Sequence, residues 1–399
     1  MEQINAKKVL FIGIGGGNDV FSTVLARESL KNLGHKWDSA DIAGVLSPFH
    51  KHSNLTEVAT RAFKINSNSE RFVVRNDGEI KLGFIDATVA KMIESGAVPG
   101  IGRVLGLELY NGSVGLERTF SELSETYDYF VLVDLGGDCF YRDDRDWHVL
   151  SPMFDAMVIQ GFCDSKVKGI LFEAGPGSDG EIDPEPLSKF LSQPGVIKYP
   201  LDDSCVNSFE SLYQNWIEPV RTGRTVPVTI AAYRSKEKEI RMTYRARAHL
   251  GDKRIYSEFE QRINTDLCKN FYLIDPIKIL WRNPFIVKCG SPLMWFLLTQ
   301  MERLRSNCEV NLEYIRDEFV GRICQFLTPS PLFSEPDRMK IIEIGLTELC
   351  QGCCDSAWMF LDDWRRVSEK WTTRLEVLKT PYSGELCLVW SPKSKNLQK

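Results

Sequence analysis

The sequence predicts an α/β fold in which helices cover both faces of a doubly wound, mainly parallel sheet. Short runs of consecutive apolar residues alternate with helical patterns along the N-terminal part of the chain. Such runs are typical of strands buried on both faces, as in parallel sheets. Glycine-rich loops follow three of the runs, where a parallel sheet needs tight turns.

Length and composition allow a large core domain with an addition. The chain has 399 residues, of which 43% are hydrophobic and 26% charged, and its formal net charge is −5. These values exclude a disordered, collagen-like or coiled-coil chain, and the negative charge argues against a nucleic-acid partner. No stretch approaches the ~18 apolar residues of a membrane span. The first residues predict a strand, not a signal peptide. Eleven scattered cysteines indicate reduced thiols and a cytoplasmic location.

Local patterns predict the individual elements. Continuous β-branched and aromatic residues indicate strands, and apolar residues three or four apart indicate helices. The expected strands are Lys8–Ile14, Asp41–Leu46, Phe130–Leu135 and Lys168–Glu173, and the expected helices are Val20–Leu33 and Pro152–Phe162. We expect them to form a Rossmann-like α/β core, residues 1–275, with three Gly/Asp loops.

Two smaller parts are expected after the core. Residues 276–327 have a helical pattern, and three prolines in 328–336 mark a connector. The last unit, residues 328–399, is expected to contain an amphipathic helix over Lys340–Trp371. A β-hairpin is expected after it, formed by Arg374–Lys379 and Leu386–Ser391.

A basic segment lies near the end of the core. Residues 221–254 hold ten Lys or Arg and three acidic residues. Strands are expected in it at Val226–Ala232 and Arg241–Ala246. The segment is either a solvated sheet edge or a positive wall over an anionic substrate.

The first glycine loop indicates a ligand-binding turn. It follows the first strand and opens a helix, and its residues are Gly13, Gly15, Gly16, Gly17, Asn18 and Asp19. Free N–H groups at a helix start favour a phosphate. Two details disagree with binding of NAD or S-adenosylmethionine: Asn18 stands where the dinucleotide fingerprint has Gly or Ala, and Ser47-Pro48 replace an acid after the second strand.

The other two loops resemble the first in position and composition. They contribute Asp134, Gly136, Gly137 and Asp138, and then Gly175, Gly177, Ser178, Asp179, Gly180 and Glu181. Because strands of an open parallel sheet end at one edge, the three loops should converge on one crevice. We expect their glycines, with Asn18, Asp134 and Ser178, to bind the ligand.

Clustered carboxylates repel one another and persist only with a cation or a catalytic use. Oxygen ligands suit Mg²⁺ or Ca²⁺, so a divalent cation is expected on four acids: Asp19, Asp134, Asp138 and Asp179. Alternatively, one carboxylate acts as general base and others bind sugar hydroxyls. The expected catalytic residues are Asp19, Asp138, Asp179 and Glu181.

Four motifs resemble a domain-of-unknown-function family of uncharacterised archaeal and bacterial proteins. They are Gly15-Gly-Gly-Asn-Asp19, Asp134-Leu-Gly-Gly-Asp138, Ser151-Pro-Met-Phe-Asp155-Ala156 and Gly175-Pro-Gly-Ser-Asp-Gly-Glu181. The resemblance covers roughly residues 8–275, and Asn18 departs from it, because the family usually has Gly there. It implies an α/β fold with a Rossmann-like core and supplies no reaction.

The leading functional hypothesis is a hydrolase, with an N-glycosidic reaction as one form, acting on a nucleotide, nucleoside or phosphosugar. This hypothesis rests on the set of acids expected at the crevice, where the sequence shows no covalent nucleophile. A second hypothesis is an NAD-dependent oxidoreductase or S-adenosylmethionine-dependent methyltransferase on the same core. The third is a non-enzymatic nucleotide sensor with a protein partner. A homo-oligomer is a general expectation for each.

Overall fold

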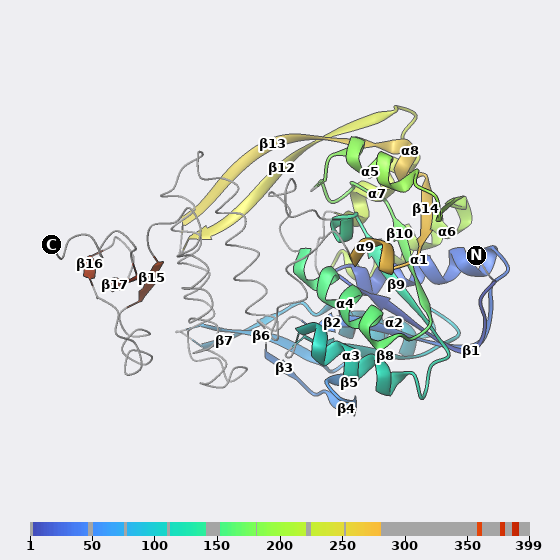
Figure 1. Cartoon of the computed structure of the whole chain (residues 1–399), viewed down its shortest axis with the longest axis horizontal. Helices are drawn as coiled ribbons and strands as arrows, with labels where there is room; N and C mark the ends of the chain where they lie inside the picture. Colours follow the sequence, from blue (N-terminus) through green and yellow to red (C-terminus); the bar gives the residue numbers. More distant parts are fainter. Residues whose placement is uncertain are drawn as a thin grey trace. The chain divides into compact units, whose positions relative to one another are not determined.

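The computed structural model describes residues 3–46, 51–75, 78–109, 112–140, 152–180, 182–220, 225–250, 253–280, 357–360, 376–379 and 385–390. Figure 1 labels the elements along the chain. The strands are β1 (Asn5–Gly13), β2 (Lys36–Leu46), β3 (Lys51–Ser53), β4 (Thr56–Ala59), β5 (Ala62–Ile65), β6 (Glu70–Arg75), β7 (Gly78–Leu82), β8 (Ile101–Glu108), β9 (Tyr129–Leu135), β10 (Gly169–Ala174), β11 (Val196–Pro200), β12 (Glu239–Leu250), β13 (Lys253–Asn264), β14 (Asn270–Ile274), β15 (Ala357–Phe360), β16 (Glu376–Lys379) and β17 (Glu385–Trp390).

The helices connect these strands. They are α1 (Asp19–Asn32), α2 (Ile85–Glu94), α3 (Gly112–Leu123), α4 (Pro152–Ser165), α5 (Pro184–Leu191), α6 (Asp203–Leu212), α7 (Thr225–Arg234), α8 (Thr265–Cys268) and α9 (Ile277–Leu280). A short 3-10 turn, η1, spans Asp138–Phe140, and a π-helical turn, η2, spans Tyr213–Ile217.

The chain forms two compact units. One consists of Met1–Thr243 and Glu260–Pro292, and the other of Tyr244–Phe259 and Leu293–Lys399. The first unit contains a nine-stranded sheet and a small sheet of order β3-β6-β7. The second contains a three-stranded sheet of order β15-β17-β16. The candidate site described below lies entirely in the first unit.

The nine-stranded sheet has the order β11-β14-β10-β9-β1-β2-β8-β5-β4. Its five central strands, β10-β9-β1-β2-β8, are parallel, and antiparallel pairs extend both edges. The expected large, mostly parallel sheet with flanking helices is therefore confirmed, and its order is compatible with a Rossmann-like fold. The chain builds outward from β1 through β2 to β8 and then returns to β9. This reversal places a switch point between β1 and β9, where open α/β sheets bind ligands.

Helices cover both faces of the sheet. Phe130 of β9 packs edge-on against Phe120 of α3 and Phe162 of α4. The next strand residue, Val131, belongs instead to the core cluster that includes Val24 of α1. Because neighbouring strand residues point to opposite faces, α3 and α4 lie on one face and α1 on the other.

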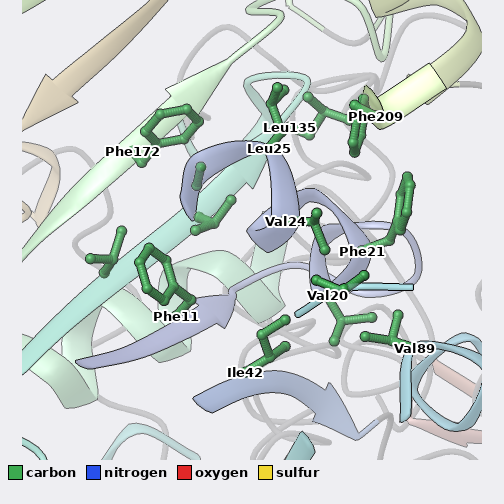
Figure 2. Close-up of a cluster of buried hydrophobic side chains, with 14 of the residues drawn as sticks. Phe11, Val20, Phe21, Val24, Leu25, Ile42, Val89, Leu135, Phe172 and Phe209 are labelled. Atoms are coloured by element: carbon green, nitrogen blue, oxygen red, sulfur yellow. The ribbon is translucent and has the colours of Figure 1, made fainter. Parts of the chain in front are cut away.

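Helix α1 is buried on nearly all sides. Figure 2 shows Val20, Phe21, Val24 and Leu25 of α1 among side chains of the sheet and of neighbouring helices. Phe21 stacks on Phe209 of α6, with ring centroids 4.6 Å apart. This packing fixes the start of α1 over the carboxyl end of β1, and Asp19 is the first helical residue.

The structure corrects two sequence predictions. Val226–Ala232 was expected as a strand because of its β-branched residues, but it lies within helix α7. The helix expected over Lys340–Trp371 is wrong at Ala357–Phe360, which forms strand β15 and pairs with β17. The expected C-terminal hairpin is confirmed by the antiparallel pair β16–β17, as is a strand over Arg241–Ala246 by β12. The helical pattern of residues 281–327 lies outside the described residues.

No helix in the described part of the chain is long and apolar enough to cross a membrane.

The packing of α1 generates the first prediction. Phe21→Ala removes a fully buried ring that stacks on Phe209, so we expect the free energy of unfolding to fall by about 3–5 kcal/mol. Denaturant titration would measure it. Ile277, which is 61% exposed, is the control, and Ile277→Ala should change stability by less than about 0.5 kcal/mol. Equal effects of the two substitutions would contradict the assigned role of Phe21.

Candidate functional site

The three glycine loops meet at the carboxyl ends of β1, β9 and β10. The Ile14 N–H donates to the Val133 carbonyl at 3.0 Å, which joins the first loop to β9. The Gly136 N–H donates to the Ala174 carbonyl at 3.1 Å, and the Gly177 N–H donates to the Gly136 carbonyl at 2.5 Å. The predicted convergence of the loops is thus present as backbone hydrogen bonds.

Two overlapping groups of acidic and thiol side chains lie at this junction. Asp19, Asp134 and Asp155 bring one carboxylate oxygen each within 4.8 Å of one another. Asp134, Cys139 and Glu173 bring together two carboxylate oxygens and a sulfur within the same limit. All five side chains are buried. Asp134 belongs to both groups.

Strand register explains why Asp134 and Glu173 are neighbours. In the parallel pair of β9 and β10, Asp134 and Glu173 are register partners. Residues that pair in this way lie side by side on the same face of a sheet. The Cys139 thiol of η1 donates to the Glu173 carboxylate at 3.7 Å from the sulfur. Asp155 reaches the same place from the first turn of α4.

Asp134 is a buried carboxylate without a basic partner among the described residues. Its exposed fraction is 0%, its oxygens accept no backbone, Lys or Arg hydrogen bond there, and its hydrogen-bonding neighbours are the Glu173 carboxyl and the Cys139 thiol. Asp41 shows how this protein otherwise treats a buried acid. Asp41 forms ion pairs with Lys8 at 3.0 Å and Arg103 at 3.1 Å, and it accepts a hydrogen bond from the Tyr127 hydroxyl at 2.6 Å. An unpaired buried charge is costly, and the described residues give Asp134 no positive partner to offset that cost.

The proximity of these acids shifts their protonation. Burial raises the pKa of Asp19 well above its usual range, and the negative charge of Asp134 adds to the increase. Backbone N–H groups of Gly15 and Leu135 donate to Asp19 and act in the opposite direction. Burial and the charge of Asp134 likewise raise the pKa of Glu173. Burial raises the pKa of the Cys139 thiol, and the charges of Asp134 and Glu173 contribute.

Glycines make room for the carboxylates. A Cβ on Gly15 would lie 2.2 Å from the Asp19 Oδ2 atom and 3.0 Å from the Asp155 Oδ1 atom, so a side chain here would occupy the carboxylate junction. Gly136 has φ +129°, a conformation that L-residues rarely adopt, and its Cβ would lie 2.9 Å from that of Asp179. Glycine at these loop positions therefore leaves the space that the carboxylate side chains occupy.

The remaining predicted residues surround the two groups. Asp138 is half-buried at the start of η1, and Asp179 is buried; both carboxylates add to the rise in the pKa of Glu173. Neither belongs to a group of three. The Ser178 and Thr229 hydroxyls share a hydrogen bond of 2.7 Å. Glu181, expected to be catalytic, lies outside the described residues.

The first loop has features that favour the binding of an anion. Asn18 precedes α1 but makes no side-chain capping bond, and its Oδ1 atom has no partner among the described residues. In the same part of the chain, no carbonyl accepts from the backbone N–H groups of Gly16 and Gly17. Such N–H groups before a helix favour anions.

The sequence analysis expected Asp155 on a helix near the crevice but not as a ligand, and it did not include Cys139 or Glu173 in the site. Glu173 carried a usable signal. Phe130–Leu135 and Gly169–Ala174 are both apolar runs with one acid before the last residue. Aligning the two runs as parallel neighbours would place Glu173 beside Asp134. Asp155 lies in a predicted helix, and which turn faces the crevice depends on packing. Cys139 gave no distinctive signal.

The donor sets define what the site can hold. Three carboxylates without nitrogen or sulfur ligands suit Mg²⁺, Mn²⁺ or Ca²⁺. The four predicted metal ligands divide here: Asp19 and Asp134 lie in this group with Asp155, while Asp138 and Asp179 lie outside it.

Comparison with known proteins places the chain in a family. A family model with the description "Protein of unknown function (DUF1152)" matches residues 10–218, just over half of the chain. The match contains every residue of both groups and ends before residue 275, to which the resemblance seen in the sequence extended. No curated protein and no solved structure matches the chain.

The second prediction concerns stability without metal. Raised pKa values mean that the folded state holds protons on Asp19 and Glu173 more tightly than the unfolded chain does. The free energy of unfolding should therefore fall as the pH rises above about 4, through the folded-state pKa values. Asp134→Asn removes the neighbouring charge. We expect it to stabilise the chelator-treated protein at pH 8 by about 0.5–2 kcal/mol, and by less at pH 4.

Thermal unfolding in EDTA at both pH values would measure this difference. Asp38→Asn is the matched control, because it makes the same charge change at an exposed position of β2. Its effect should stay within about 0.5 kcal/mol. A loss of stability in Asp134→Asn at pH 8 would contradict the repulsion that we assign to this cluster.

Proposed function

Because the chain belongs to this DUF1152 family of unknown function, we propose its activity from the site itself: it is a metal-dependent hydrolase of a nucleotide, nucleoside or phosphosugar. The observation that carries the proposal is the fully buried Asp134, which lies between other acids at the switch point of the sheet and has no basic partner among the described residues. Structural acids are normally paired, as Asp41 is. Perturbed, clustered carboxyls at a crevice are typical of functional sites.

Asp19, Asp134 and Asp155 would hold one divalent cation. Bound there, the cation supplies a positive charge that can bind a phosphate or ribose oxygen and polarise the bond to be cleaved. Asp19 is oriented for this role by the Gly15 and Leu135 N–H groups that donate to its carboxylate. Asp155 is fixed by its position on α4. Ligand geometry is thus set mainly by the scaffold, which favours a defined site.

The first loop would bind the anionic part of the substrate. The Gly16 and Gly17 N–H groups accompany the start of α1, a fourteen-residue helix whose dipole favours negative charge. Asp19 and Asp134 would repel the same phosphate when no cation is present. Substrate and cation should therefore bind together. This mutual dependence distinguishes the proposed site from a dinucleotide site, where N–H groups alone hold the pyrophosphate.

Asp138 is the best-placed general base. Among the described acids of the junction it is half-buried, whereas Asp19, Asp134, Asp155, Glu173 and Asp179 are buried. A water that enters from solvent would meet this carboxylate first. Asp138 would accept the proton as the water oxygen bonds to phosphorus or to the anomeric carbon, and the leaving group departs with the electrons of the broken bond.

The third prediction tests this proposal with a ligand panel. Thermal unfolding of EDTA-treated protein would be measured with nucleotides, nucleosides, sugar phosphates, NAD and S-adenosylmethionine, each with and without Mg²⁺. A substrate-class ligand at ~100 times its Kd should stabilise the fold by roughly 2.7 kcal/mol beyond the effect of Mg²⁺ alone, and only when Mg²⁺ is present. Product formation would then be followed for the ligands that stabilise.

Variants separate the assigned roles. Asp19→Asn should lose both the joint stabilisation and turnover. Asp138→Asn should keep the stabilisation and lose turnover by roughly 10²–10⁴-fold. Asp38→Asn should retain both. A metal-independent shift with NAD or S-adenosylmethionine would favour an oxidoreductase or methyltransferase instead. Tight nucleotide binding without product would favour a sensor, and unchanged turnover in Asp19→Asn would refute the assigned centre.

A further inference from the structure

Asp134 belongs to two sets of potential metal ligands, and a single cation does not account for both sets. The group of Asp19, Asp134 and Asp155 offers only carboxylate oxygens. The second group shares Asp134 but adds Glu173 and the sulfur of Cys139. A carboxylate has two oxygens, and neither oxygen of Asp134 accepts a hydrogen bond from a backbone, Lys or Arg group among the described residues.

Glu173 supplies an independent observation. Its exposed fraction is 0%, and its Oε1 atom has no hydrogen-bond partner in the described part of the chain. The other oxygen, Oε2, accepts the weak Cys139 thiol at 3.7 Å, and the further side-chain hydrogen bond of Glu173 is to another acid, Asp134. A cation held by Asp19, Asp134 and Asp155 would leave this carboxylate and thiol outside its ligand set. A second buried carboxylate in direct register with Asp134 then still needs a positive partner.

We propose that Asp134 bridges two divalent cations, and that Asp134, Glu173 and Cys139 form a second position selective for a thiophilic ion of the Zn²⁺ class. This proposal rests on the proposed function, because the second position adjoins the same hydrolytic centre. Two-metal sites of hydrolytic enzymes hold their ions about 3.5–4 Å apart, close enough for both ions to contact one substrate.

The donor types give the two positions different preferences. The all-oxygen set suits Mg²⁺ or Mn²⁺, which are hard cations. A thiolate is a soft ligand that selects Zn²⁺ over Mg²⁺. On binding, the Cys139 S–H bond breaks, the sulfur keeps the electron pair and forms the bond to the cation, and the proton leaves to solvent. No oxidation or reduction accompanies this step.

The location of the proposed second ion indicates which role it would have in the reaction. Asp138 begins the turn η1 that carries Cys139, and its charge acts on Glu173. A cation between Glu173 and Cys139 would therefore lie near the half-buried carboxylate that we assign as general base. Such an ion would lower the pKa of a bound water, so that water and base act together.

Cobalt is the probe for this site, because Co²⁺ replaces Zn²⁺ and a Co²⁺–thiolate bond gives a charge-transfer band in the near ultraviolet. The full chain would be treated with EDTA, dialysed and titrated with Co²⁺, and the bound metal would be counted by elemental analysis. We expect two Co²⁺ per chain and a thiolate band for one of them. In Cys139→Ser we expect one Co²⁺ per chain and no band.

Cys268→Ser is the matched control. Cys268 is also a buried free thiol near these loops, with its sulfur 3.7 Å from the Pro176 carbonyl, but it belongs to neither ligand group. Cys268→Ser should keep both ions and the band. Glu173→Gln provides a second variant in case Cys139→Ser fails to fold, and it should also reduce binding to one ion.

The outcomes separate this inference from the proposed function. One Co²⁺ per chain without a thiolate band, or a band that survives Cys139→Ser, would overturn the second position. If turnover with Mg²⁺ alone then persists, the proposed hydrolase stands with a single ion. Two ions with the expected band, but no ligand bound and no product formed, would support the bridged site and refute the proposed function.

Discussion

Repulsion among buried carboxyl groups is the constraint to which this part of the fold is adapted. Asp19, Asp134, Asp155 and Glu173 come from four different elements and meet where the dielectric constant is low. Separating them would remove the repulsion, but the sheet register fixes Asp134 beside Glu173, and the packing of α1 fixes Asp19. The packing of the apolar core therefore keeps these four carboxyl groups close together, although their repulsion destabilises the fold. Such an arrangement is typical of sites where stability has been exchanged for function.

The contrast with Asp41 shows that burial alone does not explain the cluster. Asp41 is as inaccessible as the site acids, yet Lys8, Arg103 and Tyr127 supply two cations and a hydroxyl to it. Among the described residues, no Lys or Arg forms an ion pair with Asp134. A fold that can place cations beside one buried acid can place them beside another. The described residues thus give Asp134 no positive partner, and the proposed cation site rests on this difference from Asp41.

The elements nearest the site were the easiest to predict from sequence. β1, α1, β9 and β10 carry strong apolar runs bounded by glycines, so their patterns and their tertiary environment agree. β8 was not predicted, because four of its eight residues are glycine or charged. In Val226–Ala232, β-branched residues favoured a strand by propensity, whereas packing placed them in α7. Strand register is a long-range property, and for that reason Glu173 was missed while Asp134, which precedes a visible glycine pair, was found.

The glycine loops need a different explanation from the one that their sequence first suggests. A glycine-rich turn after a first strand usually implies that a phosphate approaches the backbone. At Gly15, however, the space that a side chain would fill is already taken by the carboxylates of Asp19 and Asp155. This glycine is required whether or not a phosphate binds, whereas the N–H groups of Gly16 and Gly17 remain available for an anion. One loop can therefore serve two ligands, a cation on its inner side through Asp19 and an anion through its backbone. Opposite charges at adjacent positions would attract, and that attraction would be the physical basis for the joint binding of metal and substrate that we propose.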